Sequence, residues 1–499
     1  MYINLIIVGS GAPARWIKHI GTRTKPKHIR CLKFRPYVDS ISIRPSKPVD
    51  RGYYYKLYKN SISLIRLTLE DNGFREATNQ EWSIMWSVGN MKSEIYQSLS
   101  KYQKVNHFPR SVEITRKDCL CKNITKMQSL YGYRHFDFVP KTFVLPQELP
   151  LLVEEAENSS NKFWIVKPAA SSQGRGIFVT NNISDIPNNT QLIASKYIND
   201  PLLVNGYKFD LRIYLAITSI DPLRLYVYEE GLARFATCKY SVPIAGNKGN
   251  RFMHLTNYSV NKHNVNFVPN EDPTADDVGN KWSLTALKKH FEAAGINSQT
   301  LWARIDEILI KTVLSIEPLI KSSCDMYVPY RNSCFELLGF DILIDSALNP
   351  WLIEVNLSPS LNCDAPIDQK IKGELIADLF TMIGIVPLDQ REYSDIEILK
   401  KQSQISPYAL ILNKNKKKLG PIAKSKASNI EKTVIRETEK EYKRRGHFRR
   451  IFPTKDYAYY KTFFETERPL NQLLANHLMK QNKEQKTVLT RKPITRIKK

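Results

Sequence analysis

The chain has 499 residues, 42% of them hydrophobic and 25% charged, which excludes a largely disordered protein and allows about three domains. Its formal net charge of +25 predicts an acidic partner, which could be a nucleic acid, an anionic membrane or an acidic protein surface. The seven cysteines are dispersed and odd in number, so reduced thiols are favoured over a disulfide framework or a zinc site.

Residues 1–50 are basic and rich in proline and serine. Ten lysines and arginines stand there against only Asp39 and Asp50, and we expect little order. A mitochondrial transit peptide would look similar and is kept as an alternative. No basic segment precedes the short apolar run at the start of the sequence, so a signal peptide is not expected, and no run is long enough for a membrane-spanning helix.

Residues 51–120 are predicted to form a small N-terminal α/β domain, and residues 121–205 a central domain. In the central domain, 163–168 is a buried strand that ends on Lys167, 169–176 is a glycine-rich loop, and 177–179 is the returning strand. A lysine at this position can bind nucleotide phosphates, and Gly174 allows backbone amides to approach them closely. The P-loop and protein-kinase motifs are absent from the sequence.

Residues 206–390 are predicted to form a larger C-terminal domain. Its strand 208–218 alternates, with Lys208, Asp210 and Arg212 on one face, where Arg212 could contact a phosphate and Asp210 could orient it. An exposed edge strand is the alternative. The segments 223–228 and 231–236 are predicted to pair as a hairpin, in which Arg234 is suited to binding a carboxylate. Helices are expected at 283–290 and 301–319.

Two apolar runs, 340–344 and 351–355, flank a turn and predict a β-hairpin. If Ile344 pairs with Trp351, Asp341 lies opposite Glu354, and Asn356 shares a face with Glu354. Three oxygen ligands at this spacing suit Mg²⁺. A simply solvated polar face is the alternative, but both runs are too apolar for an exposed hairpin.

Residues 391–499 hold 28 lysines and arginines against 11 acidic residues, which is +17 of the formal charge of +25. A solvated tail is the usual interpretation of such a run. Aromatic and aliphatic residues among the basic ones favour a folded, mainly helical and cationic binding surface.

Three segments resemble the glutamylating branch of the tubulin tyrosine ligase-like family: Val-Asn-His-Phe-Pro at 105–109, His-Leu-Thr-Asn-Tyr-Ser at 254–259 and Glu-Val-Asn-Leu-Ser-Pro-Ser at 354–360. The resemblance is dense over residues 50–385 and looser to about residue 460. It implies an α/β fold with an ATP-grasp ligase core, a small N-terminal domain and a basic C-terminal extension that binds microtubules.

The resemblance also implies roles for individual residues. Lys167, Arg212 and Glu354 match catalytic positions, and Asp341, Glu354 and Asn356 match the Mg²⁺ ligands. The positions that match ATP-binding residues are Lys167, Gln173, Gly174, Ser195, Lys196, Tyr197, Ile198, Lys208, Phe209, Asp210, Thr256 and Asn257. The positions that match the site for free L-glutamate are Arg234, Tyr258, Ser259, Lys281 and Lys372.

The implied activity is ATP-dependent addition of glutamate, through an isopeptide bond, to glutamate side chains in the acidic C-terminal tails of tubulin. The implied partners are microtubules, not nucleic acid or a membrane, and the implied location is the cytoplasm and cytoskeleton, including cilia or basal bodies. Two alternatives remain: an inactive microtubule-binding protein, which the retained metal ligands and Lys167 disfavour, and a ligase for a small substrate, which would not need the basic C-terminal fifth.

Two positions bear on whether branches are started or lengthened. Relatives that initiate tend to have Arg at the position of Gln173 and an apolar residue at that of Leu357, whereas relatives that elongate tend to have Gln and His. The present sequence has Gln173 together with Leu357. Because Leu357 cannot hydrogen-bond the extra carboxylate of a branched acceptor, we expect initiation.

Overall fold

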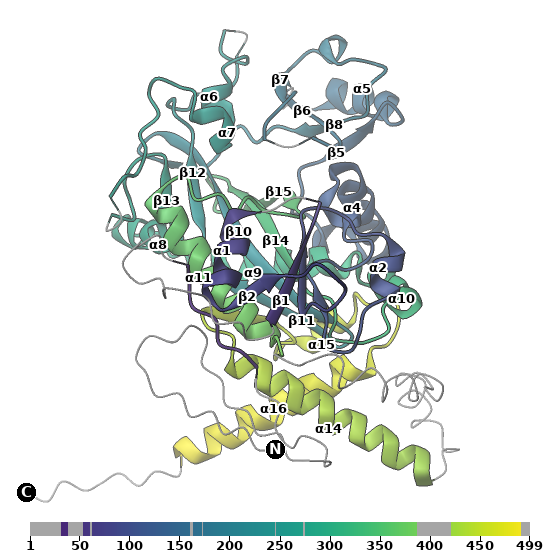
Figure 1. Ribbon diagram of the computed structural model, residues 1–499. Coiled ribbons are helices and arrows are strands. Elements are labelled where there is room, and N and C mark those ends of the chain that lie inside the picture. The colour runs from purple at the N-terminus through teal and green to yellow at the C-terminus, as the bar shows by residue number, and fades with distance from the viewer. Residues whose placement is uncertain are drawn as a thin grey trace, which may run out of the picture.

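The computed structural model describes residues 31–37, 53–59, 62–159, 163–171, 173–244, 246–272, 275–386 and 421–490. Three β-sheets organise these residues, and Figure 1 shows their arrangement. Most of residues 1–50, where little order was expected, lie outside the described residues. So do residues 391–420, which begin the segment expected to form a cationic surface. No helix in the described part of the sequence is long and apolar enough to cross a membrane.

The first sheet is parallel and has the order β2-β1-β3-β4. Its strands and helices are β1 Tyr53–Tyr58, α1 Ser63–Asp71, β2 Phe74–Glu76, β3 Ile84–Ser87, α2 Ser93–Gln97 and β4 Lys104–Val105. These elements are of the α/β type expected for residues 51–120. The helices that follow are the short α3 Val112–Thr115 and the longer α4 Lys117–Tyr131.

Residues 31–37 correct the expectation of little order before residue 50. Leu32 donates its amide to the Ile385 carbonyl at 3.1 Å, and the Phe34 amide donates to Thr381 Oγ1 at 2.9 Å. Both Leu32 and Phe34 are buried, and the Phe34 ring packs edge-on against Phe380. Leu32 and Phe34 are two residues apart, so both can face the core of an extended segment. The basic residues around them make this pattern hard to recognise in the sequence.

The second sheet is antiparallel and has the order β5-β8-β6-β7. It contains β5 Thr142–Leu145, α5 Leu149–Asn158, β6 Trp164–Pro168, β7 Phe178–Thr180 and β8 Leu192–Lys196. Its small core is built around the fully buried Trp164. The predicted strand that ends near Lys167 and its returning partner are confirmed as β6 and β7.

The third sheet has eight antiparallel strands, and the long strand β10 lies at its centre. The strands are β9 Leu203–Val204, β10 Tyr207–Ile220, β11 Leu223–Tyr228, β12 Leu232–Phe235, β13 Lys281–Ser283, β14 Glu336–Ile344, β15 Pro350–Asn356 and β16 Phe448–Phe452. On β10, Phe209, Leu211, Ile213 and the residues that continue this alternation face the largest hydrophobic core. Lys208, Asp210 and Arg212 take the other face, so the predicted alternation is confirmed and the edge-strand alternative is wrong.

Helices α8 Leu284–Ala293, α9 Gln299–Leu314 and α10 Glu317–Tyr327 contribute to the core on one face of this sheet, and α11 Pro366–Ile383 contributes to the core on the other. The short helices α6 Arg251–His254 and α7 Tyr258–Asn261 lie between β12 and β13 in the sequence. The single helix expected at 301–319 is instead two, because the helix breaks at 315–316, before Pro318. The predicted hairpin of 223–228 with 231–236 is also wrong. These two strands pair with successive parts of β10 rather than with each other.

The boundary predicted at residue 390 does not coincide with the edge of the sheet. β16 pairs with β11, and the Arg224 side chain on β11 lies 3.2 Å from Glu441. The flanking helices are α14 Pro421–Lys443, α15 Tyr457–Lys461 and α16 Pro469–Thr490, and α14 and α16 cross at the end of the molecule away from β15 (Figure 1). The strand β16 was not expected because its five residues, Phe-Arg-Arg-Ile-Phe, stand in a strongly basic segment that does not look like a strand.

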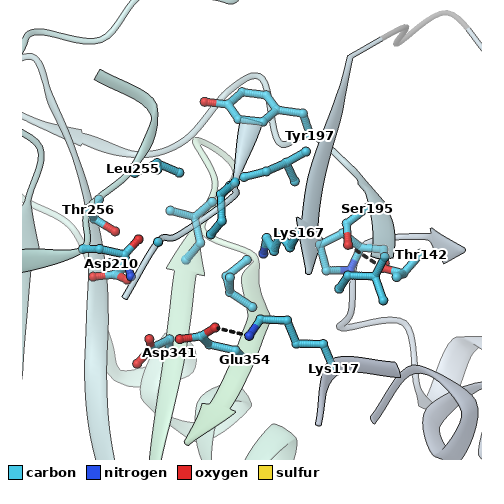
Figure 2. Close-up of a pocket in the computed structure, with 18 of the residues that line it drawn as sticks. Lys117, Thr142, Lys167, Ser195, Tyr197, Asp210, Leu255, Thr256, Asp341 and Glu354 are labelled. Atoms are coloured by element: carbon cyan, nitrogen blue, oxygen red, sulfur yellow. Dashed lines mark hydrogen bonds and ion pairs between the residues drawn. The ribbon is translucent and has the colours of Figure 1, made fainter. Parts of the chain in front are cut away.

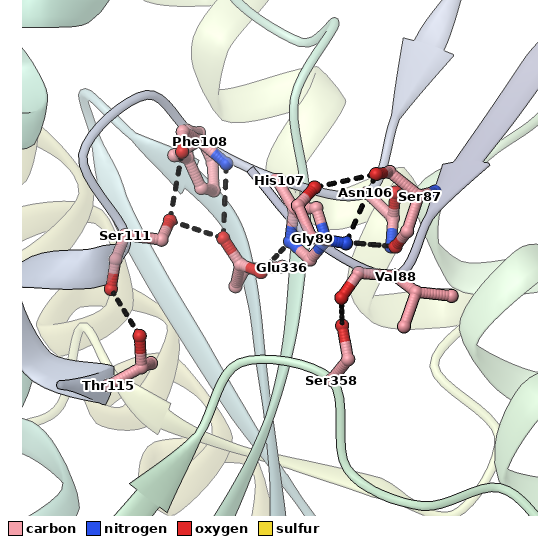
Figure 3. Close-up of polar contacts among 10 residues, drawn as sticks. All are labelled: Ser87, Val88, Gly89, Asn106, His107, Phe108, Ser111, Thr115, Glu336 and Ser358. Carbon is pink, nitrogen blue, oxygen red and sulfur yellow. Dashed lines mark hydrogen bonds and ion pairs between the residues drawn. The ribbon is translucent and has the colours of Figure 1, made fainter. Parts of the chain in front are cut away.

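A buried polar cluster joins the first sheet to the start of β14 (Figure 3). Glu336 accepts hydrogen bonds from the Phe108 amide at 3.0 Å and from Ser111 Oγ, and it also contacts His107 Nδ1. The Ser358 hydroxyl, just beyond β15, donates to the Val88 carbonyl at 2.7 Å. These contacts fix the open end of the β14–β15 hairpin, opposite its turn, against the N-terminal sheet.

Candidate active site

A row of charged side chains crosses five neighbouring strands of the large sheet. Lys281 on β13 pairs in register with Arg234 on β12, and Arg234 pairs with Asp210 on β10. Two residues along β10, Arg212 pairs with Asp341 on β14, which in turn pairs with Glu354 on β15. Cross-strand neighbours on one face lie close enough to interact, so the sheet itself brings these charges together.

The β14–β15 hairpin is confirmed, but by a different register from the one predicted. Ile344 pairs with Pro350 and Leu343 with Trp351, one residue away from the expected Ile344–Trp351 pair. An irregularity between Asp341 and Ile342 then shifts the register by one residue, as a β-bulge does, and Asp341 still faces Glu354.

Asp341 is the centre of a buried ion network. Its carboxylate accepts from Arg212 at 2.6 and 3.1 Å and lies 2.9 Å from Nη2 of Arg234, which also pairs with Asp210 at 2.5 Å. Burial alone would raise the pKa of Asp341, but the two guanidinium groups outweigh it and lower the pKa below its usual value. Asp341 is therefore an ionised carboxylate held in a fixed orientation.

A pocket opens between the β5–β8 sheet and the β14–β15 end of the large sheet (Figure 2). Its lining includes most positions predicted for the nucleotide and two of those predicted for the metal, namely Lys167, Gln173, Gly174, Ser195, Lys196, Tyr197, Ile198, Lys208, Asp210, Thr256, Asn257, Asp341 and Glu354. Its apolar walls come from both sheets: Ile165, Ile193, Leu343 and Leu352. The pocket combines apolar side chains with the lysines Lys117, Lys167 and Lys208, which suits a base with attached phosphates.

Two lysines in this pocket are buried, and burial depresses the pKa of both. Desolvation lowers the pKa of Lys167 to about 8, although Glu354 partly offsets it. Desolvation, with the nearby charge of Lys167, lowers the pKa of Lys208 to about 7. An arriving phosphate would restore full charge to both groups.

A series of hydrogen bonds fixes the position of Lys208. Its ammonium donates to the Tyr197 hydroxyl at 3.0 Å and lies 4.5 Å from the centre of that ring. The Tyr197 hydroxyl contacts His254 Nδ1 at 2.9 Å, and His254 Nε2 contacts the Asn247 carbonyl at 3.1 Å. Since a carbonyl only accepts, Nε2 carries the proton and Nδ1 accepts from Tyr197. Sequence reasoning assigned no role to His254.

Lys117 is a further pocket residue that sequence reasoning missed. It begins α4, lies 3.2 Å from Glu354 and donates to the Ser171 carbonyl at 2.8 Å. Its side chain therefore bridges β15 and the glycine-rich loop. Figure 2 shows the contact with Glu354. In the sequence, Lys117 looks like any lysine at the start of a helix. Its contact with Glu354 depends on how α4 packs, so the sequence alone could not identify it as a pocket residue.

Among the predicted nucleotide residues, Phe209 alone lies outside the pocket lining. Its side chain is 1% exposed, faces the opposite side of β10 and packs against Phe235 and Phe291. Strand alternation requires this, because its neighbours Lys208 and Asp210 face the pocket. Phe209 is a core residue.

The glycine-rich loop closes over the pocket through two contacts. Arg251 donates to the Gly174 carbonyl at 2.5 Å, and Ser259 Oγ donates to the Gln173 carbonyl at 3.0 Å. Gly174 has φ +72°, and a Cβ there would lie 2.8 Å from a methyl of Val260. Only glycine fits this turn, so the predicted loop residue has a structural explanation as well.

The residues predicted for glutamate lie outside the pocket lining but form an adjoining group. Lys281 packs 4.3 Å from the centre of the Tyr258 ring and pairs with Asp368, which also lies 2.7 Å from Lys372. Arg234 continues this group towards Asp210. Ser259 instead contacts the loop. The roles of all predicted site residues remain predictions.

The predicted metal ligands fit Mg²⁺ by donor type. Two opposed carboxylates, Asp341 and Glu354, are joined by Asn356, whose amide nitrogen donates to the Gly339 carbonyl at 3.2 Å and so leaves its oxygen as the ligand atom. Among the residues that the structure describes, no three His, Cys, Asp or Glu side chains gather as a metal site.

Nucleotide binding should take up protons near neutral pH. Burial lowers the pKa of Lys208 to about 7, and phosphate favours the charged form, so affinity should fall as pH rises through about 7. Calorimetric titration with an ATP analogue, in buffers of different ionisation enthalpy, measures this uptake. Lys208→Met should reduce it. Affinity that stays constant from about pH 6.5 to 8.5 would contradict the assignment.

Comparison with known proteins decides the family. A model of the tubulin-tyrosine ligase family matches residues 95–393, which include all five strands of the charged row, β10, β12, β13, β14 and β15. The chain belongs to this family. Its fold is thus the ATP-grasp-like α/β fold of that family, as the sequence resemblance implied.

Several family members are similar over most of the sequence. The human protein named tubulin polyglutamylase TTLL5 is 43% identical over 452 residues, which cover 85% of this protein and 35% of the human one. Human tubulin monoglutamylase TTLL4 is 39% identical, over 84% of this protein and 36% of its own length. Mouse tubulin polyglutamylase TTLL6 is 36% identical, over 82% of this protein and 48% of its own length. The present sequence therefore spans only about a third to a half of these relatives.

Proposed function

We propose that this protein is an ATP-dependent tubulin glutamylase, which joins glutamate through an isopeptide bond to glutamate side chains in tubulin tails. The observation on which the proposal rests is the row of charges that runs from the lysine-lined pocket to the Lys281 group. Family membership and the names of the relatives support the same conclusion. The proposed location is the cytoplasm and cytoskeleton.

The pocket would hold ATP as follows. Lys167, Lys208 and Lys117 would bind its phosphates, and the end of β8 from Ser195 to Ile198 would border the base. Arg212, fixed on Asp341, would face the phosphoryl group in transfer. Asp341, Glu354 and Asn356 would hold Mg²⁺, which neutralises phosphate charge when bound.

The reaction would proceed in two steps. The acceptor carboxylate attacks the terminal phosphorus of ATP, so that an acylphosphate forms and ADP leaves. The α-amine of glutamate then attacks the acyl carbon, the C–O bond to phosphate breaks, and the amine loses a proton. Both steps bring anions together, and the fixed cations Lys167, Arg212 and Arg234 would lower this repulsion.

The acceptor tail is acidic, which suits the net charge of +25. Binding should therefore weaken steeply with salt, and cosedimentation with microtubules measures it. Charge reversal at Arg445 and Arg450, which both stack on the Tyr442 ring, should weaken binding. Arg444 is less suitable because it donates to the Thr381 carbonyl within the fold. Unchanged cosedimentation would show that this surface does not bind the tail.

We further propose that the enzyme initiates branches. Leu357 is partly buried against the large core and offers no hydrogen bond to a second acceptor carboxylate. Leu357→His should shift activity towards elongation. Rates on an unmodified tail peptide and on one with a single branch glutamate measure this. A wild-type preference for the branched peptide would refute initiation.

The reaction type is tested by product stoichiometry. Protein, tubulin, ATP, Mg²⁺ and glutamate are incubated, and ADP, phosphate and incorporated glutamate are counted. One ADP and one phosphate per glutamate are expected. AMP and pyrophosphate would exclude the acylphosphate route, and microtubule binding without turnover would favour the inactive alternative.

A further inference from the structure

Asp368 is a carboxylate that the proposed reaction does not yet use. It lies in the first turn of α11, and its side chain is fully buried. A residue with no exposed surface cannot itself contact a substrate. Burying an ionised carboxylate is costly unless partners compensate it, so the role of Asp368 lies in the groups that it contacts.

Those groups are two lysines from different elements. Asp368 pairs with Lys281 at the start of β13 and, at 2.7 Å, with Lys372 one turn later on α11. Lys372 also donates to the Asn362 carbonyl at 2.6 Å, and Lys281 packs on the Tyr258 ring. Every contact holds one of the two ammonium groups in a single position.

Within the part of the chain that the structure describes, this cluster has an unmatched positive charge. Two buried ammonium groups face one buried carboxylate, and the other nearby carboxylate, Asp364, is exposed and screened by water. Burial lowers the pKa of Lys281, and Asp368 offsets part of this effect. One further anion would complete the charge balance, which makes the cluster a site for a carboxylate rather than a closed structural pair.

We propose that Asp368 is a positioning residue that holds Lys281 and Lys372 together as a binding site for one carboxylate of the incoming amino acid. This rests on the proposed ligase function. Because Lys281 is in register with Arg234, this site adjoins the row of charges that leads to Asp210 and the pocket. An amino acid held there by its carboxylate would lie beside that row.

The test is a comparison of Michaelis constants. Asp368→Asn keeps the shape but removes the charge, and the KM for glutamate should rise roughly 10–100-fold, the range for partners that orient a binding group. The KM for ATP should stay within about two-fold, since the nucleotide pocket is intact. Asp364→Asn removes the same charge beside the same lysines at an exposed position and should leave both constants nearly unchanged. A fall in kcat with an unchanged glutamate KM, or an equal effect of both variants, would overturn the proposal.

A second variant keeps the test decisive if Asp368→Asn does not fold. Lys372→Met leaves Asp368 paired with Lys281 and should reproduce the rise in the KM for glutamate; an unchanged KM would also overturn the proposal. Wild-type turnover is verified first. A wild type that joins another amino acid instead would reject the proposed function alone, and the KM for that amino acid would then test the site.

Discussion

Glu354→Gln should abolish ligation while leaving the fold intact. The variant removes a carboxylate that faces Asp341 and lies 3.2 Å from Lys117, at nearly constant shape. We expect kcat to fall at least about 10²–10³-fold, the effect of removing one preorganised group from a charged transition state. Glutamate incorporation into tubulin, measured at saturating ATP, tests this.

The matched control is Glu70→Gln. Glu70 also pairs with a cation, Arg66 at 3.2 Å, but on the partly exposed face of α1. Glu70 also accepts from the buried Tyr55 hydroxyl at 2.9 Å, a bond that the amide oxygen of glutamine can keep. The variant should therefore retain full activity and a nearly unchanged unfolding temperature. Normal turnover of Glu354→Gln would reject the assignment of this carboxylate to the reaction.

Arg212→Ala should lose both stability and activity. Arg212 donates two hydrogen bonds to Asp341, and both side chains are at most 10% exposed. Removing one partner of a buried pair leaves the other charge uncompensated, at a cost of about 3–5 kcal/mol in unfolding free energy. Arg234 still contacts Asp341 and should keep the loss at the lower end. Urea denaturation measures the loss.

A control and a second substitution separate the two losses. Arg449→Ala breaks an ion pair with Asp306 in which Arg449 is half exposed, and should cost under about 1 kcal/mol. Adding Asp341→Asn to Arg212→Ala removes the stranded charge, so stability should partly return while activity does not. Equal destabilisation by Arg212→Ala and Arg449→Ala would show that the buried Arg212–Asp341 pair contributes no more to stability than a surface ion pair.

Local sequence patterns predicted much of the site. Alternation on β10 is sufficient to put Asp210 and Arg212 on one face, and two apolar runs around a turn are sufficient for the hairpin with Asp341. The predicted register was off by one residue at the turn, and the irregularity beside Asp341 restored it. A bulge leaves no signal in a single sequence, because the extra residue, Ile353, is as apolar as its neighbours.

Contacts between distant elements could not be predicted. Lys117 reaches Glu354 only through the packing of α4, and Asp368 meets Lys281 only because α11 begins beside β13. Neither residue differs locally from a surface charge. The same holds for β16, since a five-residue strand within a basic segment acquires its place from the exposed edge of β11. Tertiary packing, not local propensity, determines these features.

Tandem mass spectrometry of tubulin tests the central claim most directly. Tubulin is incubated with the protein, ATP, Mg²⁺ and glutamate, and its C-terminal tail peptides are fragmented. We predict a mass gain of one glutamyl residue or more, attached to the γ-carboxyl group of an internal glutamate, dependent on ATP and absent with Glu354→Gln. Unmodified tails, or a residue added only at the terminal α-carboxyl group of tubulin, would contradict the proposed function.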